Sequence, residues 1–94
     1  MADITVDSTD TPDGWRFDVR VAEAGSETRH EVTLSRADHE RLAPGAAPED
    51  LVRESFVFLL EREPKESMLR SFDLSVIARY FPEYEREITK RLTV

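Results

Sequence analysis

Apolar and charged residues alternate along the first third of the chain, and this pattern predicts β-strands. The clearest alternation places four large apolar residues on one side of a strand: Trp15, Phe17, Val19 and Val21. The positions between them carry charge and belong on the solvent side: Arg16, Asp18 and Arg20. Shorter alternations cover Ile4–Val6 and Thr28–Leu34, so we expect three antiparallel strands with one apolar face toward the core. Gly25 lies between the strand that ends at Val21 and the strand that begins at Thr28, where a hairpin turn favours a residue with positive φ.

The remainder of the chain changes to a helical pattern. Ser35 and Asp38 have the spacing of a capping box, which predicts a short helix that ends after Leu42. Pro48 is suited to the first turn of a second helix. We expect that helix to continue to about Glu63, since Pro64 follows.

The C-terminal third predicts further helices. Residues 66–72 suit one or two helical turns, and Asp73 is a good N-cap for a helix over 74–81. That helix has apolar residues at i, i+3, i+4 and i+7, namely Leu74, Ile77, Ala78 and Phe81. Tyr84, Ile88 and Leu92 follow at four-residue spacing and predict a last helix.

These elements predict one α+β domain over residues 1–94. A three-stranded antiparallel sheet occupies residues 1–34, and three to four helices packed on one face of it occupy residues 35–94. The helix over 48–63 contains an uninterrupted apolar run, Phe56–Leu60, which covers its whole circumference. Because Phe56 and Phe58 point about 200° apart, we expect them to contact different elements.

The charge distribution excludes some partners. The chain has 94 residues, of which 39% are hydrophobic and 35% charged, with a net charge of −7. Residues 1–50 carry twelve acidic and five basic residues and so account for the whole excess. An acidic surface repels phosphate, so we expect neither nucleic acid nor an anionic membrane as a partner.

No sequence feature directs the chain to a membrane or an oxidising compartment. There is no cysteine, no apolar run of the about twenty residues that span a bilayer, and no signal-peptide pattern at the N-terminus. We therefore expect a soluble, cytoplasmic protein.

Catalytic and cofactor motifs are absent from the sequence. His30 and His39 lie nine positions apart on different predicted elements, which matches no metal-binding spacing, and we interpret both as structural. The glycines, Gly14, Gly25 and Gly45, are too scattered for a phosphate-binding loop. We expect no cofactor, no metal and no catalysis, with an enzyme of unrecognised site as an alternative.

A second alternative follows from the order of elements. The strand Thr28–Leu34, the helix from Ser35 and the helix Pro48–Glu63 have the order of ribbon-helix-helix repressors and antitoxins. In that family two strands pair across a dimer and enter the major groove of DNA. Glu31 would then face phosphates or base edges, which disfavours this hypothesis.

The stretch Phe58–Glu85, FLLEREPKESMLRSFDLSVIARYFPEYE, resembles the signature of a family of short bacterial and archaeal proteins with no assigned activity. Val32–Leu42, VTLSRADHERL, fits the same pattern. The resemblance implies no substrate, cofactor or catalytic residue. Its most distinctive part is the polar turn Glu63–Ser67. We interpret this turn either as a helix stop followed by an N-cap or as a recognition loop.

The leading functional hypothesis is a small non-catalytic interaction or regulatory protein. Its partner is another protein or a second copy of the chain. The candidate interaction surface comprises the charged residues around the polar turn and two apolar residues of the preceding helix: Arg62, Lys65, Glu66, Arg70, Val57 and Phe58.

Overall fold

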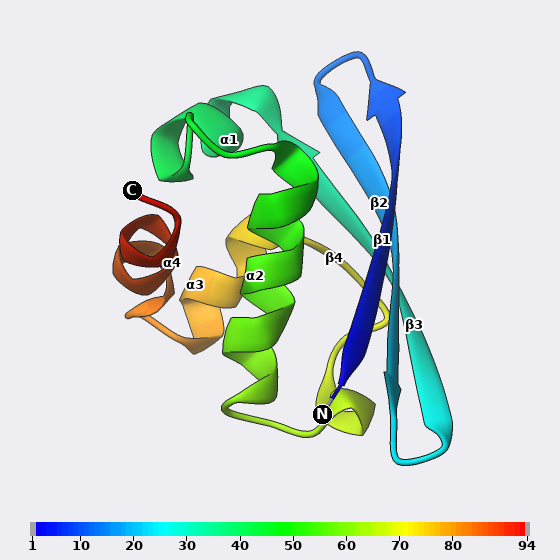
Figure 1. Cartoon of the computed structure of the whole chain (residues 1–94). Coiled ribbons are helices and arrows are strands. Elements are labelled where there is room, and N and C mark those ends of the chain that lie inside the picture. The colour runs from blue at the N-terminus through cyan, green and yellow to red at the C-terminus, as the bar shows by residue number, and fades with distance from the viewer. Residues whose placement is uncertain (1, 94) are drawn as a thin grey trace.

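The alternating segments form a twisted sheet, and the helices lie on one of its faces (Figure 1). A computed structural model describes residues 2–93. The predicted α+β class is confirmed, although the sheet has four strands in the order β1-β2-β3-β4 rather than three. The strands are β1 (Asp3–Thr11), β2 (Gly14–Glu23), β3 (Ser26–Ser35) and β4 (Ser71–Asp73).

The predicted apolar face of β2 is confirmed at three of its four positions. Phe17, Val19 and Val21 are fully buried. Trp15 is only half-buried, because it lies at the end of the strand against helix α1 (Arg36–Leu42). It packs edge-on to His39, with ring centroids 5.3 Å apart. The guanidinium of Arg36 lies 5.0 Å from the centre of its ring. Trp15 therefore closes one end of the core and does not lie inside it.

The first three strands are joined by tight turns. At the β2–β3 turn both Ala24, with φ 54°, and Gly25, with φ 79°, have positive φ, as a two-residue hairpin requires. Gly14 begins β2 directly against β3. A Cβ there would lie 2.0 Å from the carbonyl oxygen of Leu34, so only glycine fits this close approach.

The outer face of the sheet carries no helix (Figure 1), and the residues that β2 presents there, Arg16, Asp18 and Arg20, are exposed. The strand register places like charges directly opposite each other there. Asp18 pairs with Asp7 on β1 and with Glu31 on β3, which makes a row of three acids across the sheet. Arg20 and Arg29 form the adjacent row.

The fourth strand is a correction to the predicted sheet. Ser71–Asp73 runs parallel to β3, and Phe72 pairs with Val32. The sequence analysis assigned residues 66–72 to helical turns, but the short helical turn is η1 (Lys65–Ser67), and the chain then extends along β3. β3 is consequently hydrogen-bonded on both edges.

The first helix and the last helix end where they were predicted to end, and the two predicted helices between them are shorter than expected. The hydroxyl of Ser35 accepts a hydrogen bond from the Asp38 N–H, and Asp73 accepts one from the Ser75 N–H. The predicted helix to Glu63 ends at Leu60, and the predicted helix over 74–81 divides into a 3-10 turn, η2, followed by one helical turn, α3. The helical elements are α1 (Arg36–Leu42), α2 (Pro48–Leu60), η2 (Leu74–Val76), α3 (Ile77–Tyr80) and α4 (Tyr84–Leu92). Within residues 2–93, none of the helices has the length and apolar character needed to cross a membrane.

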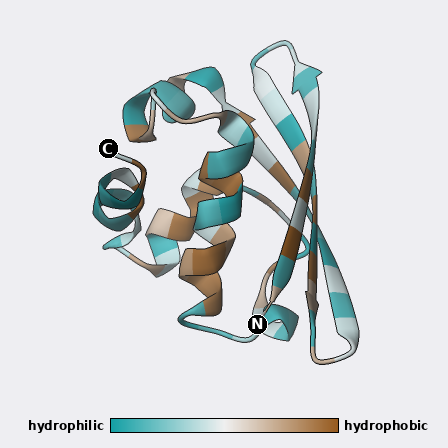
Figure 2. Cartoon of the chain, viewed as in Figure 1, coloured by the Kyte–Doolittle hydropathy of each residue, from teal (hydrophilic) through white to brown (hydrophobic). Residues whose placement is uncertain are grey.

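Helix α2 lies between the sheet and the C-terminal helices (Figure 1). Phe56 packs toward the sheet, with its ring centroid 5.4 Å from His30 and 6.1 Å from Phe72. Phe58 packs on the other side, 5.9 Å from Phe81 and 5.3 Å from Tyr84. The expectation that the two rings contact different elements is confirmed, and it explains the apolar band on α2 in Figure 2.

Candidate functional site

Arg62 and Phe58, two of the predicted surface residues, contact each other. The Arg62 guanidinium lies 3.6 Å from the centre of the fully buried Phe58 ring. It also pairs with Glu83 at 3.2 Å and with Glu61 at 3.3 Å. In this fold Phe58 belongs to the core, and Arg62 covers it; a partner has no direct access to the ring.

The polar turn after α2 is anchored by a buried lysine. Lys65 is only 4% exposed, and its Nζ lies 2.5 Å from Glu66 Oε2. This bond with Lys65 is the main reason that the pKa of the Glu66 carboxyl lies below its ordinary value. The helical turn η1 begins after Pro64, and no side chain caps it. Lys65 is therefore part of the packing, and Glu66 alone of this pair faces solvent.

The other two predicted surface residues lie apart from this cluster. Val57 is half-buried on α2. Arg70 is exposed and borders a shallow hollow on the outer face of the sheet, of about 370 Å³, together with Asp18, Arg29 and Glu31. The six predicted residues therefore do not form one continuous surface.

Both histidines make structural hydrogen bonds. His30 is 4% exposed; its Nδ1 donates to the Leu69 carbonyl at 2.7 Å, and its Nε2 lies 2.9 Å from the Thr28 hydroxyl. His39 Nε2 donates to the Ala46 carbonyl at 2.7 Å. Within residues 2–93, no three histidine or acidic side chains are placed to hold a metal ion.

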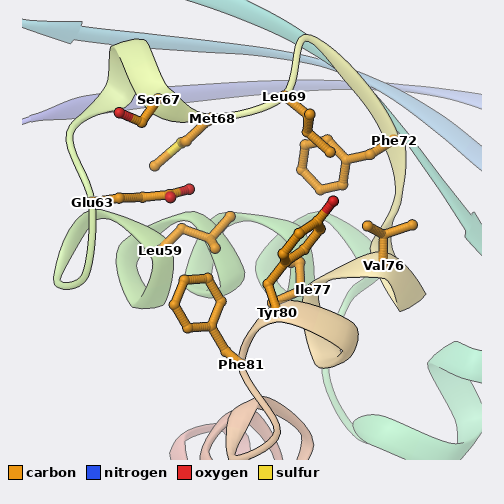
Figure 3. A pocket seen from close by; sticks show the side chains of 10 residues that line it. All are labelled: Leu59, Glu63, Ser67, Met68, Leu69, Phe72, Val76, Ile77, Tyr80 and Phe81. Carbon is orange, nitrogen blue, oxygen red and sulfur yellow. The ribbon is translucent and has the colours of Figure 1, made fainter.

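An apolar groove of about 320 Å³ opens beside α2 (Figure 3). Leu59 forms its floor, and Glu63 lies at one end of it. One wall is the segment between η1 and β4, which contributes Met68, Leu69 and Phe72. This wall follows the irregular chain that the sequence analysis treated as helical turns.

The opposite wall comes from η2, α3 and the residue after it. Val76, Ile77 and Phe81 line this side, and the Tyr80 ring reaches across toward the first wall (Figure 3). Among the described residues, the large apolar side chains that remain exposed are Leu69, at 48%, and Tyr80, at 67%. Both lie on the same groove, although they come from separate segments.

The first wall is held to the sheet by polar contacts with β3. The His30 ring binds the Leu69 carbonyl, as described above, and the Glu31 N–H donates to the Arg70 carbonyl at 2.7 Å. Asp73 fixes the end of this segment, because it accepts hydrogen bonds of 2.6 Å from the hydroxyls of both Thr33 and Ser75. Partial burial by itself would raise the pKa of the Asp73 carboxyl, but these hydrogen bonds outweigh that effect and hold the pKa below its ordinary value.

The groove residues were not predicted as a site from the sequence. One signal was available for Tyr80, since it falls outside the apolar stripe of Leu74, Ile77, Ala78 and Phe81 and so had no predicted place in the core. Leu69 had no comparable signal, because an irregular segment has no period by which to assign a face. All of the residues that line the groove fall within the stretch Phe58–Glu85, whose resemblance to a family of short proteins stays a prediction.

Comparison of the chain with protein-family models, with curated proteins and with solved structures gives no match. The function of the chain is therefore inferred from the groove itself.

Proposed function

We propose that this protein is a small, non-catalytic interaction module whose groove binds an apolar segment of a partner protein. The observation that carries the proposal is the convergence of Leu69 and Tyr80 on one groove. Large apolar side chains that gather on an otherwise polar surface mark sites of association. Met68 also lines the groove from the wall that carries Leu69, and a methionine side chain adapts readily to neighbours of different shape.

The size of the groove supports a segment of chain as the occupant. A volume of about 320 Å³ is at the lower end of the range for binding pockets, enough for a few side chains. The walls are apolar except for Glu63 and Ser67, and no group in them is a recognisable nucleophile with an adjacent base. We propose a cytoplasmic location for this binding, in keeping with a chain that has no cysteine.

The two alternative functions have less support. A ribbon-helix-helix dimer requires a strand with a free edge, and β3 already pairs with β2 and β4. An enzyme built on His30 would need a free ring nitrogen near an acid. Both nitrogens of His30 are hydrogen-bonded, and Asp18 and Glu31 project from the opposite face of the sheet.

Selection of random peptides displayed on phage tests the proposal. We expect wild-type protein to retain peptides rich in apolar residues, and Leu69→Ser or Tyr80→Ser to weaken the binding of those peptides by about tenfold or more. Arg16→Ser, on the outer face of the sheet, is the control and is expected to bind as the wild type does. Equal binding to all of these variants, or no selected peptide at all, would contradict the proposal. Light scattering of unliganded wild type and Tyr80→Ser is a separate measurement: a wild-type dimer that Tyr80→Ser dissociates would assign the groove to self-association instead.

A further inference from the structure

The groove contains one carboxylate that differs from the acids around it. Glu63 lies just beyond α2, where its N–H donates to the Leu59 carbonyl, and its side chain extends along the groove between Leu59 and Met68 (Figure 3). Glu63 as a residue is half-buried. No lysine, arginine or histidine among residues 2–93 lies within ion-pair distance of it.

The neighbouring acids are all paired, and they use the local cations. Glu61 binds Arg91 at 2.6 Å and also Arg62. Glu83 binds Arg62, and Glu66 binds Lys65. Within residues 2–93, Glu61, Glu66 and Glu83 therefore each have a cationic partner, whereas Glu63, which faces the apolar groove, has none.

An unpaired charge beside apolar walls is unfavourable, because it loses part of its hydration without gaining a partner. The loss grows when a ligand fills the groove and excludes more water. A ligand with its own cation at this place removes the penalty and makes a charge-assisted hydrogen bond. The net charge of −7 acts in the same direction, since it attracts cationic ligands from a distance.

We infer that the groove selects partner segments in which a lysine or arginine adjoins the apolar anchors, and that Glu63 is the residue that recognises this cation. The inference rests on the proposed function. In this inference Glu63 determines the specificity of the groove for cationic segments, whereas Leu69 and Tyr80 provide the affinity for apolar segments in general. A lone carboxylate does not hold a divalent metal, which in proteins takes several ligands, so the cation is that of the partner side chain.

Three pools of synthetic peptides test the inference. All have the same randomised apolar positions (Leu, Ile, Phe and Met), and they differ only in whether the remaining positions are Lys, Gln or Glu. Their binding to wild type, Glu63→Gln and Glu40→Gln is measured by fluorescence polarisation. Glu40→Gln is the matched control, because it removes the same charge from the exposed surface of α1.

We expect wild type to bind the Lys pool about five- to tenfold more tightly than the Gln pool. Glu63→Gln removes this preference, Glu40→Gln retains it, and Glu63→Lys reverses it in favour of the Glu pool. Circular dichroism checks that the variants are folded, as expected for a side chain without partners.

The other outcomes separate the inference from the proposed function. If the Lys and Gln pools bind wild type equally, or if Glu63→Gln keeps the preference for lysine, the inference is overturned and the groove still stands as an apolar docking site. If no pool binds wild type, the proposed function fails together with the inference.

Discussion

The hydroxyl of Tyr84 donates a hydrogen bond of 2.7 Å to the hydroxyl oxygen of Ser55 inside the core. The direction follows from the neighbours, since the single hydroxyl hydrogen of Ser55 is used on the Leu51 carbonyl, also at 2.7 Å. Both residues are buried, and the bond joins α4 to α2. Burial raises the pKa of the Tyr84 phenol well above its ordinary value, because a phenolate there would lose its hydration.

Tyr84→Phe is expected to change how stability depends on alkaline pH. A pKa that is higher in the folded chain than in the unfolded chain gives stability that is complete below the unfolded value, about 10, and is lost as the pH rises above it. The free energy of unfolding of the wild type therefore falls above that pH. Tyr84→Phe has no group to ionise at this position. Its free energy of unfolding is expected to be about 1 kcal/mol lower than that of the wild type at neutral pH and to decrease less as the pH rises. Urea unfolding at a series of pH values measures the unfolding free energy of both proteins. If the two free energies fell in parallel with pH, the raised pKa of Tyr84 would be contradicted.

Asp73→Ala is expected to loosen the first wall of the groove. The variant loses the cap of η2 and the bond to Thr33, which together cost about 1–2 kcal/mol at neutral pH. Because the pKa of Asp73 is lowered by folding, its stabilisation is present above the ordinary carboxyl pKa and is lost as the pH falls through the lowered value. The difference in unfolding free energy between wild type and variant should therefore shrink in acid. Amide hydrogen exchange should also accelerate at Phe72 and not at Val19.

Trp15 and Phe17 are expected to differ in their contribution to stability, although they share one face of β2. Phe17→Ala removes a fully buried ring and should cost about 3–5 kcal/mol. Trp15→Ala removes a half-buried ring at the end of the core and should cost clearly less. Denaturant unfolding followed by circular dichroism gives both values. An equal cost would place Trp15 in the core after all.

Asp18→Asn is expected to stabilise the protein. Asp18 faces Asp7 and Glu31 directly across the strands, and like charges in these positions destabilise a sheet, so the substitution should gain about 0.5 kcal/mol. The gain should decrease with added salt, which screens exposed charges. Glu40→Gln makes the same change in net charge away from the sheet and is expected to have no such effect. A gain of the same size in both variants would indicate a general effect of net charge.

The elements that have a regular period could be predicted from the sequence. The alternation from Trp15 to Val21 predicted β2 and its buried side, and the uninterrupted apolar run Phe56–Leu60 predicted the central place of α2, because both patterns are local. The caps at Ser35 and Asp73 were predictable for the same reason. The side-chain chemistry at a helix start depends on only a few neighbouring residues.

The groove was not predictable, since it depends on contacts between distant segments. β4 has three residues and no alternation long enough to detect, and it forms because His30, Glu31 and Thr33 of β3 bind the chain there. The sequence also pointed to Lys65 as a surface charge. Its burial results from how the turn folds back on the domain, which no local pattern encodes.

The parallel pairing of β4 with β3 determines the order in which the chain can fold. Strands β1 to β3 are consecutive hairpins and can pair as soon as they are synthesised, whereas the bond from Thr33 to Asp73 spans 40 residues and must wait for both α1 and α2. Until then β3 presents an unpaired edge, which can pair with another unfinished chain. The wall of the groove is thus also the cover of that edge, and a variant that weakens it should aggregate during synthesis before it shows any loss of binding.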